Sequence, residues 1–293
     1  MTYSGTKSLT KYGSYLFILV PLVLVIVIIV VPFFKAIYYS FTKFSAMSAP
    51  EFVGLHNYIT LFKDPRFLGS IKNNALIAAA SPLWIFVPLI LAVILFQSRS
   101  LLSTSARMTI LLPYALSMTV VGVMFRSFLW TKGPLNTLLE SVGLGYLALD
   151  WLGDPKLGML IIISTALWKD FGWYAMVYFA GLSNINADLF DAAKVDGANW
   201  RQQFFFVIIP SLNVIIVLVT TLVLIADFRY MFGYVFNLTR GGPGYATHTV
   251  EFLLYREAFN YFRFGYACSL GVVMFIAICG FSYFQIRIMS RTA

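Results

Sequence analysis

Long runs of apolar residues alternate along this chain with shorter polar segments that hold most of the charged side chains. A helix needs about 20 mostly apolar residues to cross the hydrocarbon core of a bilayer. Six stretches reach roughly this length, and all six are expected to be helices, because lipid offers no hydrogen-bond partner to an open sheet. The predicted spans are residues 15–34, 73–98, 108–125, 157–182, 204–231 and 264–286.

The connections between the predicted spans alternate in length. Two short connections, residues 99–107 and 183–203, lie on the same side as both termini, because the number of spans is even. Three long loops, residues 35–72, 126–156 and 232–263, lie on the other side. Lys and Arg are only slightly denser on the side of the short connections, so the positive-inside rule favours that side as cytoplasmic only weakly.

The composition agrees with an integral membrane protein. Of 293 residues, 60% are hydrophobic and 11% are charged, and the mean hydropathy is +0.82. These values lie outside the range of soluble globular domains. The net charge of +9 is spread over the ends of the spans, which is typical of membrane-flanking residues and argues against a nucleic-acid interface.

Residues for hydrolytic chemistry are absent from the sequence. There is no G-x-x-x-x-G-K-[ST] phosphate-binding loop, so ATP must be bound by another polypeptide. His56 and His248 are isolated, so neither a zinc site nor a catalytic triad is predicted. Cys268 and Cys279 lie in one apolar run, roughly 16 Å apart along a helix, which is too far for a disulfide.

The polar segment of residues 183–210, which we call the elbow, has a pattern of its own. It contains the run DAAKVDGANWRQQFFFVIIP, in which small residues follow an acid and an aromatic and aliphatic run ends at Pro210. Gly197 can adopt backbone angles that are closed to other residues, so one short helix is expected to end there and a second to begin. The segment is therefore predicted to form a helix-turn-helix beside the membrane.

The elbow resembles the EAA loop of binding-protein-dependent ABC importer permeases. Asp191 stands where that family usually has Glu, and Ile209 where it usually has Leu, and both changes keep the chemistry. The resemblance implies an all-α integral membrane fold of the MetI-like type with six transmembrane helices. It also implies that the elbow is the cytoplasmic element that sits in a cleft of the ATPase subunit. The residues that match are Asp191, Ala192, Ala193, Asp196, Gly197, Ala198, Phe204, Phe205 and Pro210.

Two further segments resemble the same family, so the resemblance covers nearly the whole chain. Residues 52–58, FVGLHNY, resemble its V-G-L-x-N-Y segment. Leu61 and Phe62 add a small apolar face, which suits either contact with a receptor or a plain loop helix. Residues 238–243, LTRGGP, resemble the T-x-G-G-P loop of the class that contains the larger maltose-transporter permease. The chain is therefore expected to be the first-type half of a heterodimeric channel.

Two charged residues lie inside the fourth predicted span. Lys169 and Asp170 are costly in a membrane, so they are expected to face the protein interior or a watery cavity. Trp173 follows one turn later on the same face, and polar groups beside an aromatic ring suit a carbohydrate. Trp168 and Tyr174 are expected to point elsewhere, into packing or lipid. The alternative is that Lys169 and Asp170 form a structural ion pair.

The fifth predicted span repeats this pattern near its end. Asp227 and Tyr230 are three residues apart and share a face, with Arg229 adjacent. The sugar contacts of the resembled family also fall on the two spans that flank the elbow. The alternative is that Asp227 and Arg229 only mark the membrane surface. An anionic solute such as glycerol phosphate or a uronate glycan would use Lys169 and Arg229, whereas the acids slightly favour recognition of neutral hydroxyls.

Pattern and resemblance together predict the permease subunit of a bacterial ABC importer for a sugar or sugar-like solute, working by alternating access. Residues 1–14 are expected to be a cytoplasmic N-terminus and residues 15–293 a single transmembrane domain. The resemblance implies a second permease subunit, an ABC ATPase dimer that binds ATP and Mg, and an extracytoplasmic solute-binding protein, with no cofactor in this chain. It implies the inner membrane as location, with both termini in the cytoplasm.

Two other classes of protein are the alternatives to this prediction. A self-contained secondary transporter would need internal repeat symmetry and its own ion-coupling residues, and the sequence has no convincing repeat. A membrane-embedded enzyme would need catalytic groups that converge at one depth, and only Lys169 and Asp170 are available for that. Copurification with an ATPase separates the ABC permease from both.

Overall fold

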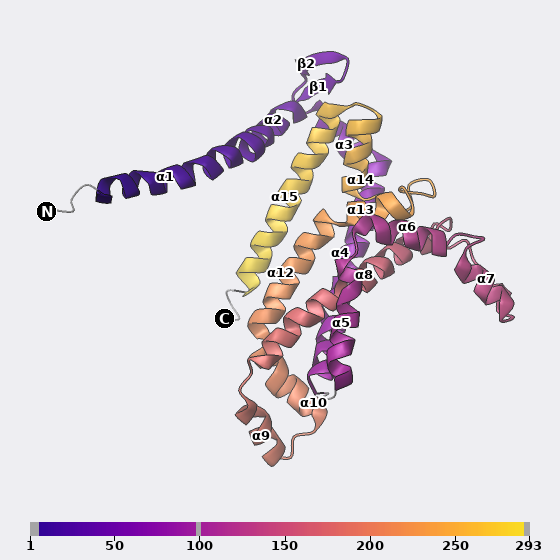
Figure 1. Ribbon diagram of the computed structural model, residues 1–293. Coiled ribbons are helices and arrows are strands. Elements are labelled where there is room, and N and C mark those ends of the chain that lie inside the picture. Colours follow the sequence, from indigo (N-terminus) through magenta and orange to yellow (C-terminus); the bar gives the residue numbers. More distant parts are fainter. Residues whose placement is uncertain (1–5, 98–100, 290–293) are drawn as a thin grey trace. The chain divides into compact units, whose positions relative to one another are not determined.

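The computed structural model describes residues 6–97 and 101–289, and at some helical positions only their backbone. The described chain is mostly helical, with one two-stranded sheet (Figure 1). It divides into two compact units: unit 1 comprises residues 1–63 and 254–276, and unit 2 comprises residues 64–253 and 277–293. The single transmembrane domain predicted for residues 15–293 stays a prediction, and each unit is described by itself.

Unit 1 begins with a long helical run that leads into a β-hairpin. The most apolar window of this run, within Phe17–Ser40, contains no buried residue, so its aliphatic side chains face outward. Phe33 meets Phe275 at a ring-centroid distance of 4.9 Å, which joins the run to the last helix. The elements are α1 (Thr6–Val25), η1 (Ile26–Val30), α2 (Val31–Ser40), β1 (Thr42–Ser45), β2 (Ser48–Phe52), α3 (His56–Lys63), η4 (Arg256–Asn260) and the first part of α15 (Phe264–Met289).

Asn57 holds the start of α3 against the base of the hairpin. Its amide nitrogen donates to the carbonyl oxygens of Ser40 and Thr42, at 2.8 and 2.9 Å. The hydroxyls of Tyr58 and Ser40 lie 2.6 Å apart. Leu61 is fully buried whereas Phe62 is 56% exposed, so only part of the apolar face expected on this helix is covered. The N-Y pair of the V-G-L-x-N-Y segment thus has a structural role in this chain.

Unit 2 contains the remaining helices and the larger hydrophobic core. The core lies where α4 packs along α8 and α12, and it includes Ile85, Tyr178, Leu212 and Tyr234. The elements are α4 (Pro65–Gln97), α5 (Leu101–Ala115), α6 (Met118–Phe128), α7 (Pro134–Ser141), η2 (Gly145–Leu147), α8 (Leu157–Ser183), α9 (Ala187–Val195), α10 (Trp200–Gln203), η3 (Phe204–Ile208), α11 (Ile209–Ser211), α12 (Asn213–Arg229), α13 (Met231–Leu238) and most of α14 (Val250–Tyr255).

Three described helices are long and apolar enough to cross a membrane, namely Phe17–Ser40, Pro65–Gln97 and Phe264–Tyr283. They agree with the first, second and sixth predicted spans. The number rises to five if two strongly bent helix pairs each count as one span. The fourth predicted span coincides with α8, a single helix of 27 residues, whose hydropathy is lowered by Lys169 and Asp170.

The third and fifth predicted spans are bent, so the prediction of two continuous helices is wrong at these points. α5 and α6 meet at 93°, because Ser117 is extended and its hydroxyl accepts the N–H of Val120 at 3.2 Å as the N-cap of α6. α11 and α12 meet at Leu212, where the bend is 73°. This bend follows two residues after Pro210, which cannot donate a backbone hydrogen bond.

Candidate transport cavity and coupling elbow

The elbow forms the predicted helix-turn-helix, with the break at Gly197. The α9 helix ends at Val195, and Gly197 has a φ of +73°. The N–H of Ala198 then donates to the carbonyl of Ala193 at 2.9 Å, a bond that closes the helix end. Asn199 and Gln202 form a reciprocal capping box that starts α10. The prediction that one helix ends and another begins at Gly197 is confirmed.

The elbow presents small and charged residues on its surface. Asp191, Ala192 and Asp196 are exposed, while Ala193 and Ala198 are half-buried. The Asp191 carboxylate accepts from the Lys194 ammonium at 2.9 Å in an exposed ion pair, which is worth little to stability. Val195 is 88% exposed, so an apolar side chain points away from the unit. The exposed face lets another surface approach closely.

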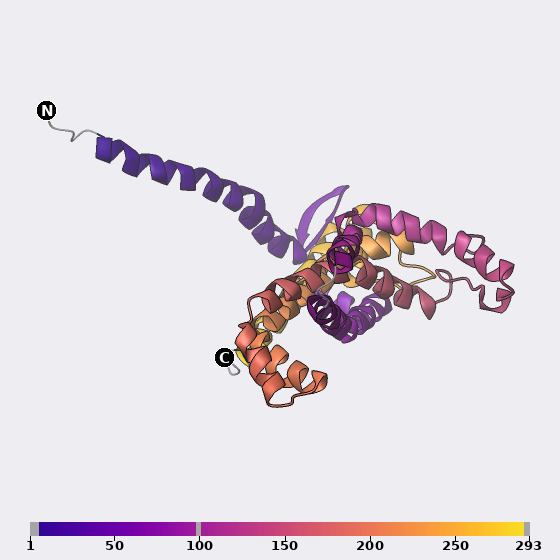
Figure 2. The same cartoon turned by 60° about the horizontal axis from the view of Figure 1, so that its bottom comes forward.

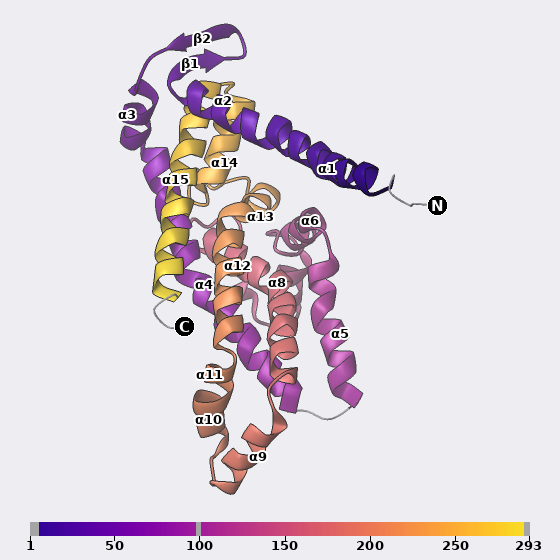
Figure 3. The ribbon, with the colours of Figure 1, turned by 90° about the vertical axis from the view of Figure 1, so that its left-hand side faces the viewer.

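The two matched phenylalanines of the elbow have different environments. Phe204 is buried and stacks on the Trp200 ring at 5.6 Å, whereas Phe205 is 60% exposed. The indole N–H of Trp200 donates to the side-chain oxygen of Gln97, the last residue of α4, at 3.2 Å. Phe96 of α4 also meets Phe190 of α9 at 6.0 Å. The elbow, at the bottom of Figure 3 and in the foreground of Figure 2, is therefore joined directly to α4.

A cavity of about 560 Å³ opens elsewhere in unit 2. It lies between α8, α12 and the bent pair α5 and α6, and its size is typical of small-molecule sites. The predicted residues Lys169, Asp170, Trp173 and Tyr230 all line it. The other lining residues are Tyr114, Met118, Tyr174, Leu222, Ile225 and Ala226.

The charged pair and an aromatic platform meet in this cavity. The Lys169 ammonium lies 3.5 Å from the Asp170 carboxylate and donates to the backbone carbonyl of Tyr114 at 3.2 Å. The Tyr234 hydroxyl donates to the second Asp170 oxygen at 3.2 Å. The Trp173 and Tyr114 rings stack with centroids 5.0 Å apart and planes inclined by 11°. Tyr114 carries no charge or motif, and the packing of α5 along α8 brings it here.

Asp227 occupies a separate, tighter place. It is 5% exposed and accepts a 2.5 Å hydrogen bond from the Ser81 hydroxyl of α4. It lines a narrow gap beside the cavity, together with Asp170 and Tyr230. The expectation that Asp227 and Tyr230 share a face is confirmed there. The side chain of Arg229 lies outside the described residues.

The position of Tyr174 differs from the expectation based on the sequence. It lines both the cavity and the neighbouring gap, whereas the sequence placed it away from the charged pair. It follows Asp170 by four residues, and this spacing puts both on one helix face. Trp168 does lie elsewhere, against the Phe125 ring at 5.1 Å.

The glycine-rich loop of residues 238–250 is fixed to the start of α4. The Asn73 amide donates to the carbonyls of Ala246 and His248 at 2.9 and 2.8 Å. The Asn74 side chain accepts from the N–H of Val250 and donates to the Glu251 carboxylate, at 2.9 and 3.1 Å. Burial raises the pKa of Glu251. Neither asparagine is predicted from the sequence to have a role, although two adjacent amides at the entry of an apolar helix are a usable signal.

The fold and the site define a membrane component of a transport system. The family model described as "Binding-protein-dependent transport system inner membrane component" matches residues 84–291, and the chain belongs to this family. The predictions of a multi-pass membrane location and of a transport subunit rather than an enzyme are thereby confirmed. The family's description also names its dependence on a binding protein.

Relatives and solved structures extend this picture. The chain is 34% identical over 283 residues to "Probable ABC transporter permease protein YurN" of Bacillus subtilis (94% of this chain, 96% of the relative). It is 29% identical over 289 residues to "Multiple sugar-binding transport system permease protein MsmF" of Streptococcus mutans (97% and 98%).

The fold is similar to a chain in the crystal structure of a bacterial alginate ABC transporter in complex with alginate pentasaccharide-bound periplasmic protein. The TM-score is 0.86 at 22% identity, with 98% of this chain and 97% of that chain covered. The predicted all-α fold of the importer-permease type is confirmed.

Proposed function

We propose that this chain is the permease subunit of an ATP-driven importer of a sugar or oligosaccharide and works by alternating access. The substrate passes through the cavity between α8, α12 and the α5–α6 pair. Support comes from the family membership and from a relative whose name refers to sugar transport. The alternative of a self-contained secondary transporter would need an internal repeat, and the sequence has no convincing one.

The observation that carries this proposal is the aromatic platform beside the charged pair. Trp173 is 40% exposed, with its ring stacked on Tyr114 and directed into the cavity. The C–H faces of a sugar pack on such a ring, while its hydroxyls bond to polar groups at the edge. Asp170 is an acceptor on the same face, one turn from Trp173.

The charges of the cavity favour a neutral sugar over an anionic one. Lys169 and Asp170 are the only ionisable Lys, Arg, Asp or Glu residues among the described residues that line it. The Lys169 ammonium already meets the Asp170 carboxylate and the Tyr114 carbonyl, so an anion would compete with both. Glycerol phosphate or a uronate glycan is the second candidate substrate. The positive charge of Lys169 in the cavity favours it.

The elbow couples the cavity to a partner ATPase in this proposal. Its exposed surface around Asp191, Asp196 and Gly197 fits into the cleft of an ABC ATPase, which binds ATP and Mg. The other partners are a second permease subunit, for which the loop of residues 238–243 makes this chain the first-type half, and an extracytoplasmic solute-binding protein. Both termini then lie in the cytoplasm.

Substitution of Trp173 by Ala tests the cavity. With the transporter purified from native membranes and reconstituted in liposomes, we expect sugar uptake to fall about tenfold, since loss of one stacking platform is worth about 1.4 kcal/mol. Trp168→Ala is the matched control, because Trp168 lies on the same helix outside the cavity. Equal uptake by both variants would show that the substrate does not pass through this cavity.

A further inference from the structure

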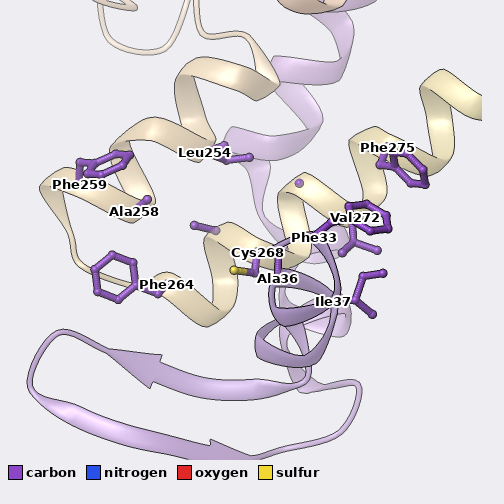
Figure 4. A pocket seen from close by; sticks show the side chains of 12 residues that line it. Phe33, Ala36, Ile37, Leu254, Ala258, Phe259, Phe264, Cys268, Val272 and Phe275 are labelled. Carbon is purple, nitrogen blue, oxygen red and sulfur yellow. The ribbon is translucent and has the colours of Figure 1, made fainter. Parts of the chain in front are cut away.

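An apolar slot lies within unit 1, alongside α15 (Figure 4). Its volume is about 470 Å³, and no charged side chain lines it. Four phenylalanine rings border the space, and small residues of α15 leave it open. The residues that matter here are Phe33, Phe259, Phe264, Phe275, Ala267 and Gly271.

Two walls of the slot come from α2 and α15, which both belong to helices long and apolar enough to span a bilayer. Leu254, Ala258 and Phe259 complete the lining. Phe259 and Phe264 stand at one end, where α15 begins, and Val272 and Phe275 stand towards the other (Figure 4). The contact between Phe33 and Phe275 borders that far end. A sugar finds no hydrogen-bonding side chain in such a lining except the Cys268 thiol.

A cationic cluster stands at the end of the slot where α15 begins. Arg256 donates to the Tyr261 hydroxyl at 2.5 Å, and the guanidinium carbons of Arg256 and Arg263 lie 5.3 and 5.5 Å from the Tyr261 ring centre. Arg263 also pairs with the buried Glu257. Two guanidinium groups against one carboxylate leave this cluster with a net positive charge. Its residues directly flank Ala258, Phe259 and Phe264 of the slot.

We propose that the slot and this cluster form a binding site for one anionic phospholipid. An acyl chain occupies the slot, and the phosphate meets Arg256 and Arg263, because guanidinium groups bind phosphate oxygens in a paired geometry. The apolar lining and the cationic cluster at one end together match an amphiphile with an apolar chain and an anionic head. The lipid would fill the space between α2 and α15.

The test uses the full-length chain in the transporter purified from native membranes and placed in bilayers. Phosphatidylglycerol or phosphatidylcholine, each with a photoreactive diazirine in the acyl chain, is added as a trace, and labelled peptides of this chain are identified by mass. We expect phosphatidylglycerol to label residues 264–275 several times more than phosphatidylcholine does. Equal labelling by the two lipids, or no labelling of this segment, would overturn the proposal.

Two matched pairs of variants separate the slot from the cluster. Gly271→Leu fills the slot, where a Cβ would first meet Leu254 at 3.4 Å, while Gly280→Leu adds the same side chain where nothing lies within 4 Å. Only Gly271→Leu should abolish the labelling. Arg256→Gln should remove the preference for phosphatidylglycerol, and Lys43→Gln on the hairpin should leave it intact.

Each remaining outcome contradicts the proposal. Labelling that survives Gly271→Leu would mean that the lipid lies outside the slot. If Arg256→Gln is still labelled more by phosphatidylglycerol than by phosphatidylcholine, the cluster does not bind the headgroup. If Cys268, in a Cys279→Ser background, cross-links to a second permease while lipid labelling is absent, a protein occupies the slot.

Discussion

The two ends of unit 2 contrast in how their residues are held. At the elbow end, Asp191 and Val195 are exposed, and one hydrogen bond joins Trp200 to Gln97 of α4. At the other end, Asn73 and Asn74 of the same helix bind the loop of residues 238–250, and Thr247 and Thr249 are fully buried.

In the proposed function, this difference separates a surface that binds a partner from a part that is held within the unit. α4 has 33 residues and is therefore about 50 Å long, so it connects both ends. Its middle holds Ser81, which binds Asp227 beside the cavity. α4 thus contacts the elbow, the gap beside the cavity and the loop of residues 238–250, and in the proposed function it carries movement of the elbow to the cavity.

The largest effect is expected from Gly197→Val at the elbow. At a φ of +73°, the backbone conformation of a residue with a Cβ costs about 1–2 kcal/mol of free energy. A β-branched residue costs more. Since nothing lies within 4 Å of the added Cβ, the chain should fold with an altered turn. We expect uptake by the reconstituted transporter to fall at least about tenfold, the ratio that 1.4 kcal/mol provides.

Gly143→Val is the matched control for the elbow. Gly143 has a φ of +79° and equally open surroundings, but it follows α7, far from the elbow in the sequence. The control should keep its uptake. If both variants transport equally well, or lose transport equally, the elbow has no special role and the contrast between the two ends fails.

An intermediate effect is expected from Asp170→Asn in the cavity. The substitution leaves the largely buried Lys169 without its carboxylate partner, which costs about 3–5 kcal/mol when an ion pair is buried and less here, because the Asp170 side chain is 23% exposed. The unfolding temperature and the uptake should both fall. The double variant Lys169→Leu with Asp170→Leu should recover the unfolding temperature without recovering uptake. Full uptake by the double variant would make the pair purely structural.

The smallest effect is expected at the fixed end, from Glu251→Gln. Burial raises the Glu251 pKa above its ordinary 4.5, so the folded protein holds a proton that the unfolded chain releases. Stability from this group is present below pH 4.5 and is lost as pH rises through the raised pKa. Gln keeps an acceptor for Asn74 and does not titrate. The unfolding temperature of the variant should therefore exceed that of the wild type increasingly as pH rises, and an equal pH dependence would contradict this.

The sequence predicts the helices and the elbow well, because both depend on local signals. Apolar length sets the spans, and a glycine between two short amphipathic segments sets the turn at Gly197. The bend at Ser117 was missed because an N-cap serine inside an apolar run does not interrupt the hydrophobic pattern. The stacking of Tyr114 on Trp173 depends on the packing of α5 along α8, which the pattern also does not encode.

Long-range contacts set the rest of the site. The sequence predicts Lys169, Asp170 and Trp173 as a group, because their spacing places them on one face of a helix. Ser81 and Asp227 are 146 positions apart, and Asn74 and Glu251 are 177 apart. Only the packing of α4 in the core brings these pairs together, and no periodicity in the chain encodes that packing.

The central claim, that the elbow binds an ATPase, is tested most directly by site-specific cross-linking. In a background of Cys268→Ser and Cys279→Ser, a benzophenone-maleimide is attached at Val195→Cys in the elbow or at Met47→Cys in the hairpin, and the transporter is irradiated in native membranes. Both side chains are exposed, at 88% and 100%. We predict that the Val195 probe joins this chain to an ATP-binding subunit and that the Met47 probe does not. An ATPase cross-linked from Met47, or none from Val195, would contradict the account.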